Sequence, residues 1–319
     1  MNALDFVKKR WFLFGLVIVS LITLIDGSES VAALGKWCKA QGGGNAVIFL
    51  IFLASGLILN NEQIRKGLGD LKGTALALIL IFVMAPAVAY AVSALPMDRG
   101  ARIGLFLVAV TPTTMTSGAV MTGAAGGNMA HALLITVLAN GMSMLTIPLS
   151  LGVLLGIGGE GGAVSIEKGK MMLQIAFLVL VPLVAGMLLR PRRTGLAQRL
   201  RRGVPVFTQS MILAIVWMGL SGARGAVLSG GARTLQVAVF AFLFHALLLV
   251  VAFGLVKLFR VGPGRRESVI FMGGQKTLPL SVLLQTTLFP GYGLALAFCV
   301  IHHFVHLMMD GYLVHRLGR

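Results

Sequence analysis

The sequence has little charge and few acidic residues. Only 12% of its 319 residues are charged, and 10 Asp and Glu stand against 27 Lys and Arg. A soluble domain carries about twice this charged fraction. Apolar runs recur along nearly the whole chain, whose mean hydropathy is +0.92. No stretch remains that could form a sizeable soluble domain, so the composition indicates one membrane-embedded unit.

Cysteine is almost missing as well. Cys38 and Cys299 are far apart and form no CxxC pair, which excludes a disulfide framework and a thiolate metal motif. The glycine-rich stretches lack the strand–helix context that a phosphate-binding loop requires. A nucleophile–base pair of an enzyme is not evident either. We therefore expect no catalytic residues, no enzyme activity and no cofactor.

The net charge of +17 does not indicate nucleic-acid binding. Most Lys and Arg lie in short segments beside apolar runs, where such residues orient membrane helices. A basic groove interleaved with aromatic residues is absent from the sequence. The expected partners are membrane lipid and a small-molecule organic anion, with no nucleic acid, and the oligomeric state stays open.

Ten apolar segments approach the length of about 20 residues that crosses a bilayer. They are predicted at 11–26, 45–60, 73–95, 102–124, 129–157, 169–190, 205–222, 234–259, 267–288 and 291–314. The first follows Lys8, Lys9 and Arg10, as the apolar part of a signal peptide would. Nine further spans favour an uncleaved first helix.

Basic residues are divided unequally by this topology. With a cytoplasmic N-terminus, eighteen of the 27 Lys and Arg lie on the cytoplasmic side, eight on the other side and one, Lys276, inside a span. Since Lys and Arg are enriched in cytoplasmic loops, this distribution predicts that both termini are cytoplasmic. We expect a multi-pass protein of the bacterial inner membrane.

Six arginines between residues 190 and 202 divide the ten spans into five and five. An odd number of spans in each half forces the halves into opposite orientations. Inverted repeats of this kind are typical of secondary transporters. The predicted fold is an all-α polytopic membrane protein with ten transmembrane helices in two inverted five-helix repeats.

The fourth and ninth spans occupy equivalent places in the two halves, and both are interrupted. The fourth contains the segment Thr111-Pro112-Thr113-Thr114-Met115-Thr116-Ser117-Gly118, and the ninth contains Gly273-Gly274-Gln275-Lys276-Thr277-Leu278-Pro279. Pro removes a helix hydrogen bond and Gly weakens the helix. Free backbone at membrane depth persists only where it is buried in protein or lines a cavity. Paired breaks therefore predict the substrate site.

Polar side chains at these breaks are the candidate substrate-binding residues. They are Thr113, Thr114, Thr116, Ser117, Gln275, Lys276 and Thr277. A lysine this deep in the membrane indicates function, or else an ion pair, for which Asp310 is the candidate partner. The alternative for the Ser and Thr hydroxyls is a hydrogen bond to the carbonyl four residues back in their own helix.

A second polar run lies on the tenth span, at His302, His303, His306 and Asp310. Positions 302, 306 and 310 share one helix face. A proton relay, a substrate contact through His303 and His306, and a hydrogen-bonded helix contact all fit this run, whereas a metal site would need more carboxylate or thiolate ligands. The single residues His131 and His245 are interpreted as hydrogen-bonded core histidines.

At the two breaks the chain resembles the bile acid:sodium symporter superfamily. The resemblance rests on Pro112-Thr-Thr with Ala-Gly-Gly-Asn128, and on the more specific motif from Gly274 to Leu280. It covers nearly the whole chain and is closest to the sodium-bile-acid-symporter-like branch, which includes the vertebrate member-seven type of solute carrier family ten.

The resemblance implies a panel and a core, which move relative to one another. It places the panel helices at approximately 11–60 and 169–222 and the core helices at approximately 73–157 and 234–314, with the interrupted fourth and ninth helices crossing in the core. The substrates it implies are organic anions, often moved together with sodium.

The sequence departs from the sodium-coupled relatives at several implied ligands. A glutamate expected four residues before Gln275 is Phe271, and an expected fifth-span serine is Ala132. Thr136 and Gln275 remain as candidate sodium ligands, and Lys276 stands where a small polar residue is expected. We interpret the Lys276 ammonium as a replacement for a sodium ion, with the coupling ion, sodium or proton, left open.

Together these features predict a secondary active transporter that moves a small organic, anionic solute by alternating access. The alternative is a non-transporting membrane regulatory protein that retains the transporter fold. The first reading expects flux and substrate-dependent stabilisation, and the second expects neither.

Overall fold

The computed structural model describes residues 11–59, 70–157, 167–191 and 194–318. Over these ranges every regular element is a helix, which agrees with the predicted all-α class. The basic residues at 8–10, 65, 66, 192, 193 and 319, which entered the charge distribution, lie outside the described residues.

Helices lie at all ten predicted spans, although a further helix at Ser30–Ala40 was not predicted and the helix at span 205–222 extends over Thr194–Gly230. The elements before residue 160 are α2 (Trp11–Ile25), α3 (Ser30–Ala40), α4 (Gly43–Ile58), α6 (Leu71–Ile79), η1 (Leu80–Met84), α7 (Ala85–Ser93), α8 (Arg99–Val110), α9 (Ser117–Ala124) and α10 (Met129–Ile157). The later elements are α11 (Lys168–Ile175), η2 (Ala176–Leu180), α12 (Val181–Leu188), α13 (Thr194–Gly230), α14 (Ala232–Leu258), α15 (Arg266–Gly274), α16 (Leu278–Leu288) and α17 (Gly293–Leu317).

Two of these helices pass through a π-helical turn just before a proline. In η1 the N–H of Ala85 donates to the carbonyl of Leu80, and Pro86 follows. In η2 the N–H of Val181 donates to Ala176, and Pro182 follows. A proline has no N–H to donate, and a π-turn shifts the hydrogen-bond pattern by one residue so that the helix continues past it.

Six helices in the described part of the chain are long and apolar enough to cross a membrane, or seven if the bent pair α2–α3 is one span. The remaining predicted spans are shorter: α4 has 16 residues, and α8–α9 and α15–α16 are each interrupted. The polytopic membrane class is thus confirmed. The arrangement of ten helices as an inverted repeat stays a prediction.

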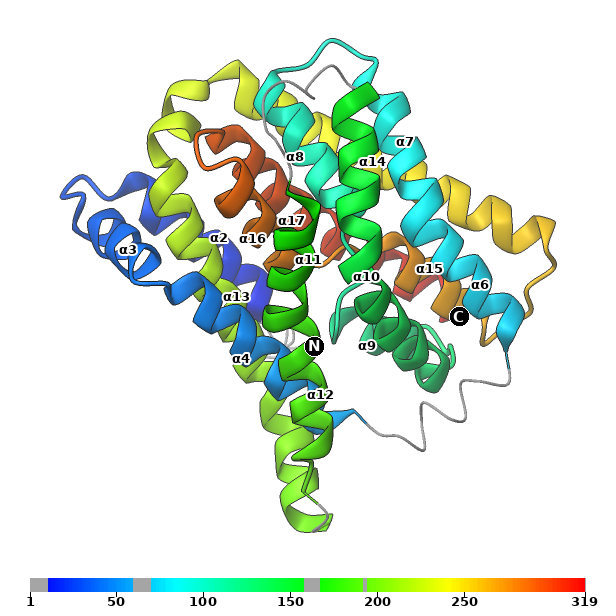
Figure 1. Cartoon of the computed structure of the whole chain (residues 1–319). Helices are drawn as coiled ribbons and strands as arrows, with labels where there is room; N and C mark the ends of the chain where they lie inside the picture. Colours follow the sequence, from blue (N-terminus) through cyan, green and yellow to red (C-terminus); the bar gives the residue numbers. More distant parts are fainter. Residues whose placement is uncertain (1–10, 60–69, 158–166, 192–193, 319) are drawn as a thin grey trace.

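The helices pack in two groups that meet along α13, α16 and α17. On one side α4 lies against α12 and α13, and α2 and α3 also pack on α13. On the other side α17 packs on α8 and α14, and α15 packs on α9, α14 and α6 (Figure 1). The division into panel and core helices, and their motion relative to one another, stays a prediction.

The contact between α4 and α12 is close because small residues face each other. A Cβ added at Gly56 or at Gly186 would overlap the backbone of the partner helix. Glycine at such contacts lets helix backbones approach one another, which is how helices associate in membranes.

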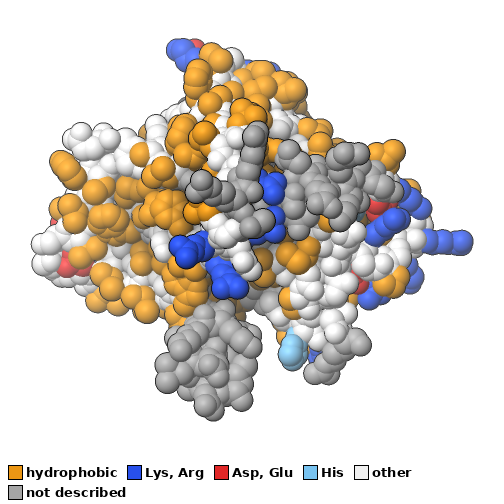
Figure 2. Space-filling model, turned by 90° about the horizontal axis from the view of Figure 1, so that it is seen from below, with side chains coloured by type: hydrophobic (Ala, Val, Ile, Leu, Met, Phe, Trp, Pro, Cys, Tyr) orange, Lys and Arg blue, Asp and Glu red, His pale blue; other side chains and the backbone are white. Residues whose placement is uncertain are grey.

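The outer surface of the helices is apolar. Large hydrophobic side chains are exposed along several helices, including Leu149, Val153, Phe177, Val239 and Val250. Seen from below, Lys and Arg side chains gather at the middle and toward the right edge of the view, whereas hydrophobic side chains cover much of the left and upper parts (Figure 2). An apolar surface of this extent fits contact with lipid chains.

Candidate functional site

The two predicted breaks lie against each other in the middle of the molecule. Helix α8 ends at Val110 and the chain continues extended through Thr111, while α15 ends at Gly274 and Gln275 is extended. The N–H of Thr277 donates to the carbonyl of Pro112 over 2.9 Å. A proline disfavours the helical conformation at the residue before it, here Thr111, so α8 ends at Val110.

Gln275 joins the two breaks through its side chain. Its carbonyl oxygen accepts from the hydroxyl of Thr114 at 2.7 Å and from that of Ser117 at 3.0 Å. The Ser117 hydroxyl also lies 2.9 Å from the hydroxyl oxygen of Thr114, which accepts from the N–H of Gly118. The predicted clustering of hydroxyl and amide groups at the breaks is therefore a single connected network.

The amide nitrogen of Gln275 extends this network to the tenth span. It donates to Oδ2 of Asp310 at 2.8 Å, and Oδ1 of Asp310 lies 3.1 Å from Nε2 of His245. His245 comes from α14, and one of its ring nitrogens is bonded to this carboxylate. No sequence pattern pairs His245 with Asp310, which is 65 residues away.

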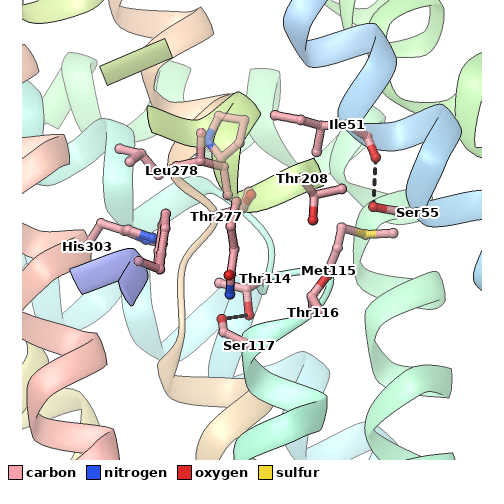
Figure 3. Close-up of a pocket in the computed structure, with 14 residues that line it drawn as sticks. Ile51, Ser55, Thr114, Met115, Thr116, Ser117, Thr208, Thr277, Leu278 and His303 are labelled. Carbon is pink, nitrogen blue, oxygen red and sulfur yellow. Dashed lines mark hydrogen bonds between the residues drawn. The ribbon is translucent and has the colours of Figure 1, made fainter. Parts of the chain in front are cut away.

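A small pocket opens beside the crossing. Five predicted residues line it, Thr114, Thr116, Ser117, Thr277 and His303, together with Ser55 of α4 and Thr208 of α13 (Figure 3). Its volume is about 40 Å³. The sequence did not single out Ser55 and Thr208 as site residues. Each hydroxyl bonds to a carbonyl of its own helix, which is the common arrangement for Ser and Thr and does not mark a site.

The other predicted site residues lie behind the pocket wall. Thr113, Gln275, Lys276 and His306 are buried and do not line the pocket. The hydroxyl of Thr136, a candidate sodium ligand, donates to the carbonyl of Ala132 in its own helix. Gln275, the other candidate, has its carbonyl oxygen occupied by hydroxyl donors of the break in α8–α9.

The ammonium of Lys276 lies among three backbone carbonyls. Its Nζ donates to Ile81 at 2.9 Å, to Ala109 at 3.0 Å and to Thr111 at 3.1 Å. The side chain is 2% exposed. In the described part of the chain no ion pair joins it to Asp310, so that predicted alternative is wrong: the carboxylate is bonded elsewhere.

Proline and helix ends leave these three carbonyls available. In η1 the N–H of Ala85 reaches back five residues to Leu80, and the corresponding donor for Ile81 would be Pro86, which has no N–H. The other two carbonyls lie at the end of α8, where the last carbonyls of a helix have no partner within it. Lys276 therefore supplies donors that the backbone itself cannot.

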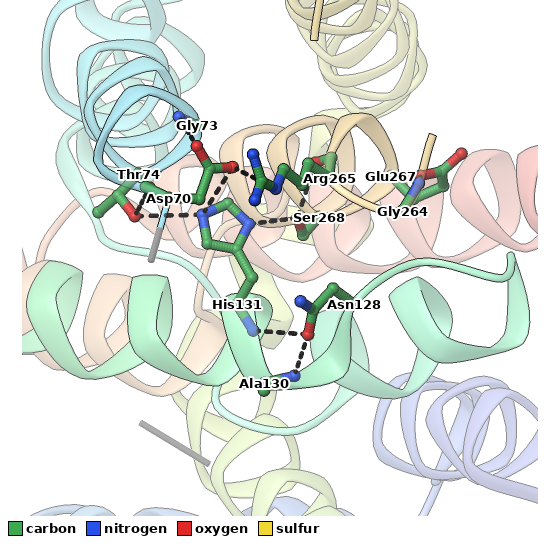
Figure 4. Close-up of polar contacts among 10 residues, drawn as sticks. All are labelled: Asp70, Gly73, Thr74, Asn128, Ala130, His131, Gly264, Arg265, Glu267 and Ser268. Atoms are coloured by element: carbon green, nitrogen blue, oxygen red, sulfur yellow. Dashed lines mark hydrogen bonds and ion pairs between the residues drawn. The ribbon is translucent and has the colours of Figure 1, made fainter. Parts of the chain in front are cut away.

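A separate polar cluster joins the first turns of α6, α10 and α15 (Figure 4). His131 contacts Ser268 through Nδ1 at 2.6 Å and Thr74 through Nε2 at 3.1 Å, and Asp70 pairs with Arg265 at 3.3 Å. The interpretation of His131 as a hydrogen-bonded core histidine is confirmed. This cluster holds three helix ends together and lies outside the pocket.

The chain matches a known family model over most of its length. The model is described as the SBF-like CPA transporter family and matches residues 10–319. A rice protein named as a probable chloroplastic sodium/metabolite cotransporter, BASS4, is 28% identical over 284 residues, which are 83% of this chain and 66% of the relative. The chain thus spans slightly less than two thirds of that relative's length.

Two further relatives are matched over more of their length. Sodium/bile acid cotransporter 7-B of Xenopus laevis is 23% identical over 301 residues, 92% of this chain and 86% of the relative. YfeH of Escherichia coli is 25% identical over 313 residues, 94% of this chain and 92% of the relative.

Proposed function

Since the chain belongs to the SBF-like CPA transporter family, we propose that it is a secondary active transporter that moves a small organic anion by alternating access. The family is one of transporters, in agreement with the expectation of no enzyme activity. The relatives named as cotransporters of sodium with a metabolite or with bile acid support a small-molecule solute.

The observation that carries this proposal is the position of the pocket. One wall is the crossing of the two broken helices, and the opposite wall is α4 and α13, which belong to the other group of helices. Its 40 Å³ hold about three water molecules at ~10–15 Å³ each, whereas sites for organic ligands measure about 300–1,000 Å³. A solute therefore needs α4 and α13 to move away from the crossing.

Two features of the pocket favour an anionic solute. Helices α9 and α16 both begin at it, since Ser117 and Leu278 are their first residues and both line the pocket. Helix N-termini carry unpaired N–H groups and positive potential, as at anion sites of other transporters. None of the lining residues is acidic.

The lysine bears on the coupling ion. Unwound carbonyls near broken helices are what binds sodium in transporters, and here three such carbonyls already hold the Lys276 ammonium. We infer that this tethered cation replaces a sodium ion, and that transport proceeds without sodium binding at this position.

The experiment is a thermal-shift screen of the purified protein against organic anions, followed by uptake into proteoliposomes with and without a sodium gradient. A stabilising anion should be taken up, and uptake should fall in Thr208→Val and Thr277→Val. Ser210→Ala is the matched control on α13, since Ser210 bonds back to Val206 and does not line the pocket.

Uptake equal to wild type in both threonine variants would show that the pocket is not the solute site. If no anion stabilises the protein and none is taken up, the transport proposal fails. That result would favour the non-transporting regulatory protein.

A further inference from the structure

Four buried histidines gather near Asp310, and one of them, His303, lines the pocket. His302, His303 and His306 come from α17, and His245 comes from α14. The ring centroids of His303 and His306 are 4.6 Å apart, those of His302 and His306 are 5.5 Å apart, and those of His245 and His306 are 5.8 Å apart. The rings therefore form a continuous series.

The ring nitrogens of this cluster are largely without hydrogen-bond partners. Among the described residues, the buried nitrogens that lack a partner include Nδ1 of His245, Nε2 of His302, and both nitrogens of His303 and of His306. Buried polar atoms nearly always have partners, and exceptions call for an explanation. These nitrogens are free to bind a ligand that arrives and leaves.

The ligand that fits this cluster is the proton. In the part of the chain that the structure describes, no group of three or more His, Cys, Asp or Glu residues has the geometry to hold a metal ion. Of the four histidines, His303 lines the pocket beside the crossing. We propose that His245 and Asp310 form a proton-binding site, which supplies the coupling ion of the proposed transporter; this second step rests on the proposed function.

The charges around the pair select His245 as the acceptor. The titratable groups packed against His245 are His302 and His306 on α17, and beyond them His303 and the Lys276 ammonium lie close to His302. Of the four histidines, His245 is the one with a carboxylate partner, at 3.1 Å. An adjacent carboxylate stabilises an imidazolium, whereas burial alone disfavours it.

The proton step is simple to balance. Because an ionised carboxylate can only accept a hydrogen bond, neutral His245 carries its proton on Nε2, which lies 3.1 Å from Oδ1 of Asp310, and Nδ1 carries a free lone pair. A proton from water binds Nδ1, forms one N–H bond and leaves an imidazolium beside the carboxylate. Release to water on the other side of the membrane reverses the step. The site gains one positive charge, as it would from one sodium ion.

Two connections link this pair to the solute pocket. His303 lines the pocket and packs edge-on against His306. Asp310 accepts from Gln275, whose carbonyl oxygen accepts from Thr114 and Ser117, both of which also line the pocket. A change of charge at Asp310 and His245 therefore acts directly on the groups that face the solute.

The proton site is tested without any solute, by nitrogen-15 NMR of the full chain with labelled histidine imidazoles. Between about pH 8 and pH 5, the range in which histidine changes charge, the His245 signals should move from neutral imidazole to imidazolium. His245→Gln identifies these signals, and His131→Gln is the control outside the cluster. Titration should be lost in Asp310→Asn and retained in Asp310→Glu.

An unchanged neutral His245 over this range, or the same titration in Asp310→Asn as in wild type, overturns the proton site. If Asp310→Asn does not fold, Asp310→Glu and wild type still decide the matter.

In proteoliposomes that take up an anion, an inward proton gradient should accelerate uptake, and a pH dye inside should report acidification. An uptake rate that does not change with the proton gradient refutes the coupling step but not the proposed transport. Titration of His245 without any uptake refutes the proposed transport and leaves the proton site established.

Discussion

Replacement of Lys276 by methionine isolates what its ammonium contributes. Met has a similar length and an apolar end, so the side chain still fills its buried position while the three carbonyls of Ile81, Ala109 and Thr111 lose their donor. Neither proline nor the end of α8 can supply another donor locally. The variant thus opens a cage of three oxygens in the middle of the protein.

The magnitude follows from two opposing contributions. Three hydrogen bonds from a charged donor contribute about 2 kcal/mol each, or about 6 kcal/mol in all. Removing the ammonium also removes the cost of burying its charge, which is about 4 kcal/mol. The net loss is about 2 kcal/mol, which lowers the Tm of a chain of this size by about 3 °C.

The assay compares Tm in sodium chloride and in choline chloride at equal ionic strength. If the empty cage binds sodium, a concentration of about 100 times the Kd returns about 2.7 kcal/mol, enough to restore wild-type stability. The variant should therefore be stabilised by sodium, and the wild type should not respond. Lys170→Met is the control, because the Lys170 side chain is 78% exposed and pairs with Glu167 at the surface.

An unchanged Tm of Lys276→Met in both salts would refute this reasoning, since the ammonium would then contribute nothing to the carbonyls. A loss of stability without recovery in sodium would have a different meaning. This result would support a structural role for the Lys276 ammonium and would refute the inference that it replaces a sodium ion.

Gly273→Ala should lower the Tm of the purified protein more than Gly274→Ala, because an added Cβ at 273 overlaps a side chain of η1 while at 274 it meets atoms no closer than 3.5 Å; equal losses would contradict the packing of α15 on η1. Gly186→Leu should reduce the yield of monodisperse protein in size-exclusion chromatography by separating α12 from α4, and an unchanged yield would speak against that close contact. For orientation, cysteine labels at Gly195 and Ser229, the two ends of α13, should react from opposite sides of the membrane, with 195 cytoplasmic; reaction from the same side would contradict the inverted halves.

Much of the fold was available from the sequence because its signals are local. Hydropathy located the helices, and the prolines and glycines located the breaks, since each acts on backbone hydrogen bonds within a few residues. The helix ends at Val110 and Gly274 and the restarts at Ser117 and Leu278 fall within the two predicted interruptions. The family resemblance rests on the same segments.

Tertiary structure decided which groups meet, because contacts across many residues leave no periodic trace in a single sequence. The partner of Asp310 is His245 on another helix rather than Lys276, and the ammonium instead reaches carbonyls whose availability depends on Pro86 and on the end of α8. The hydroxyls of Ser55 and Thr208 face the pocket only because α4 and α13 pack against the crossing. The sequence by itself thus determined where the backbone is freed, and only three-dimensional packing decided which side chains use the freed groups.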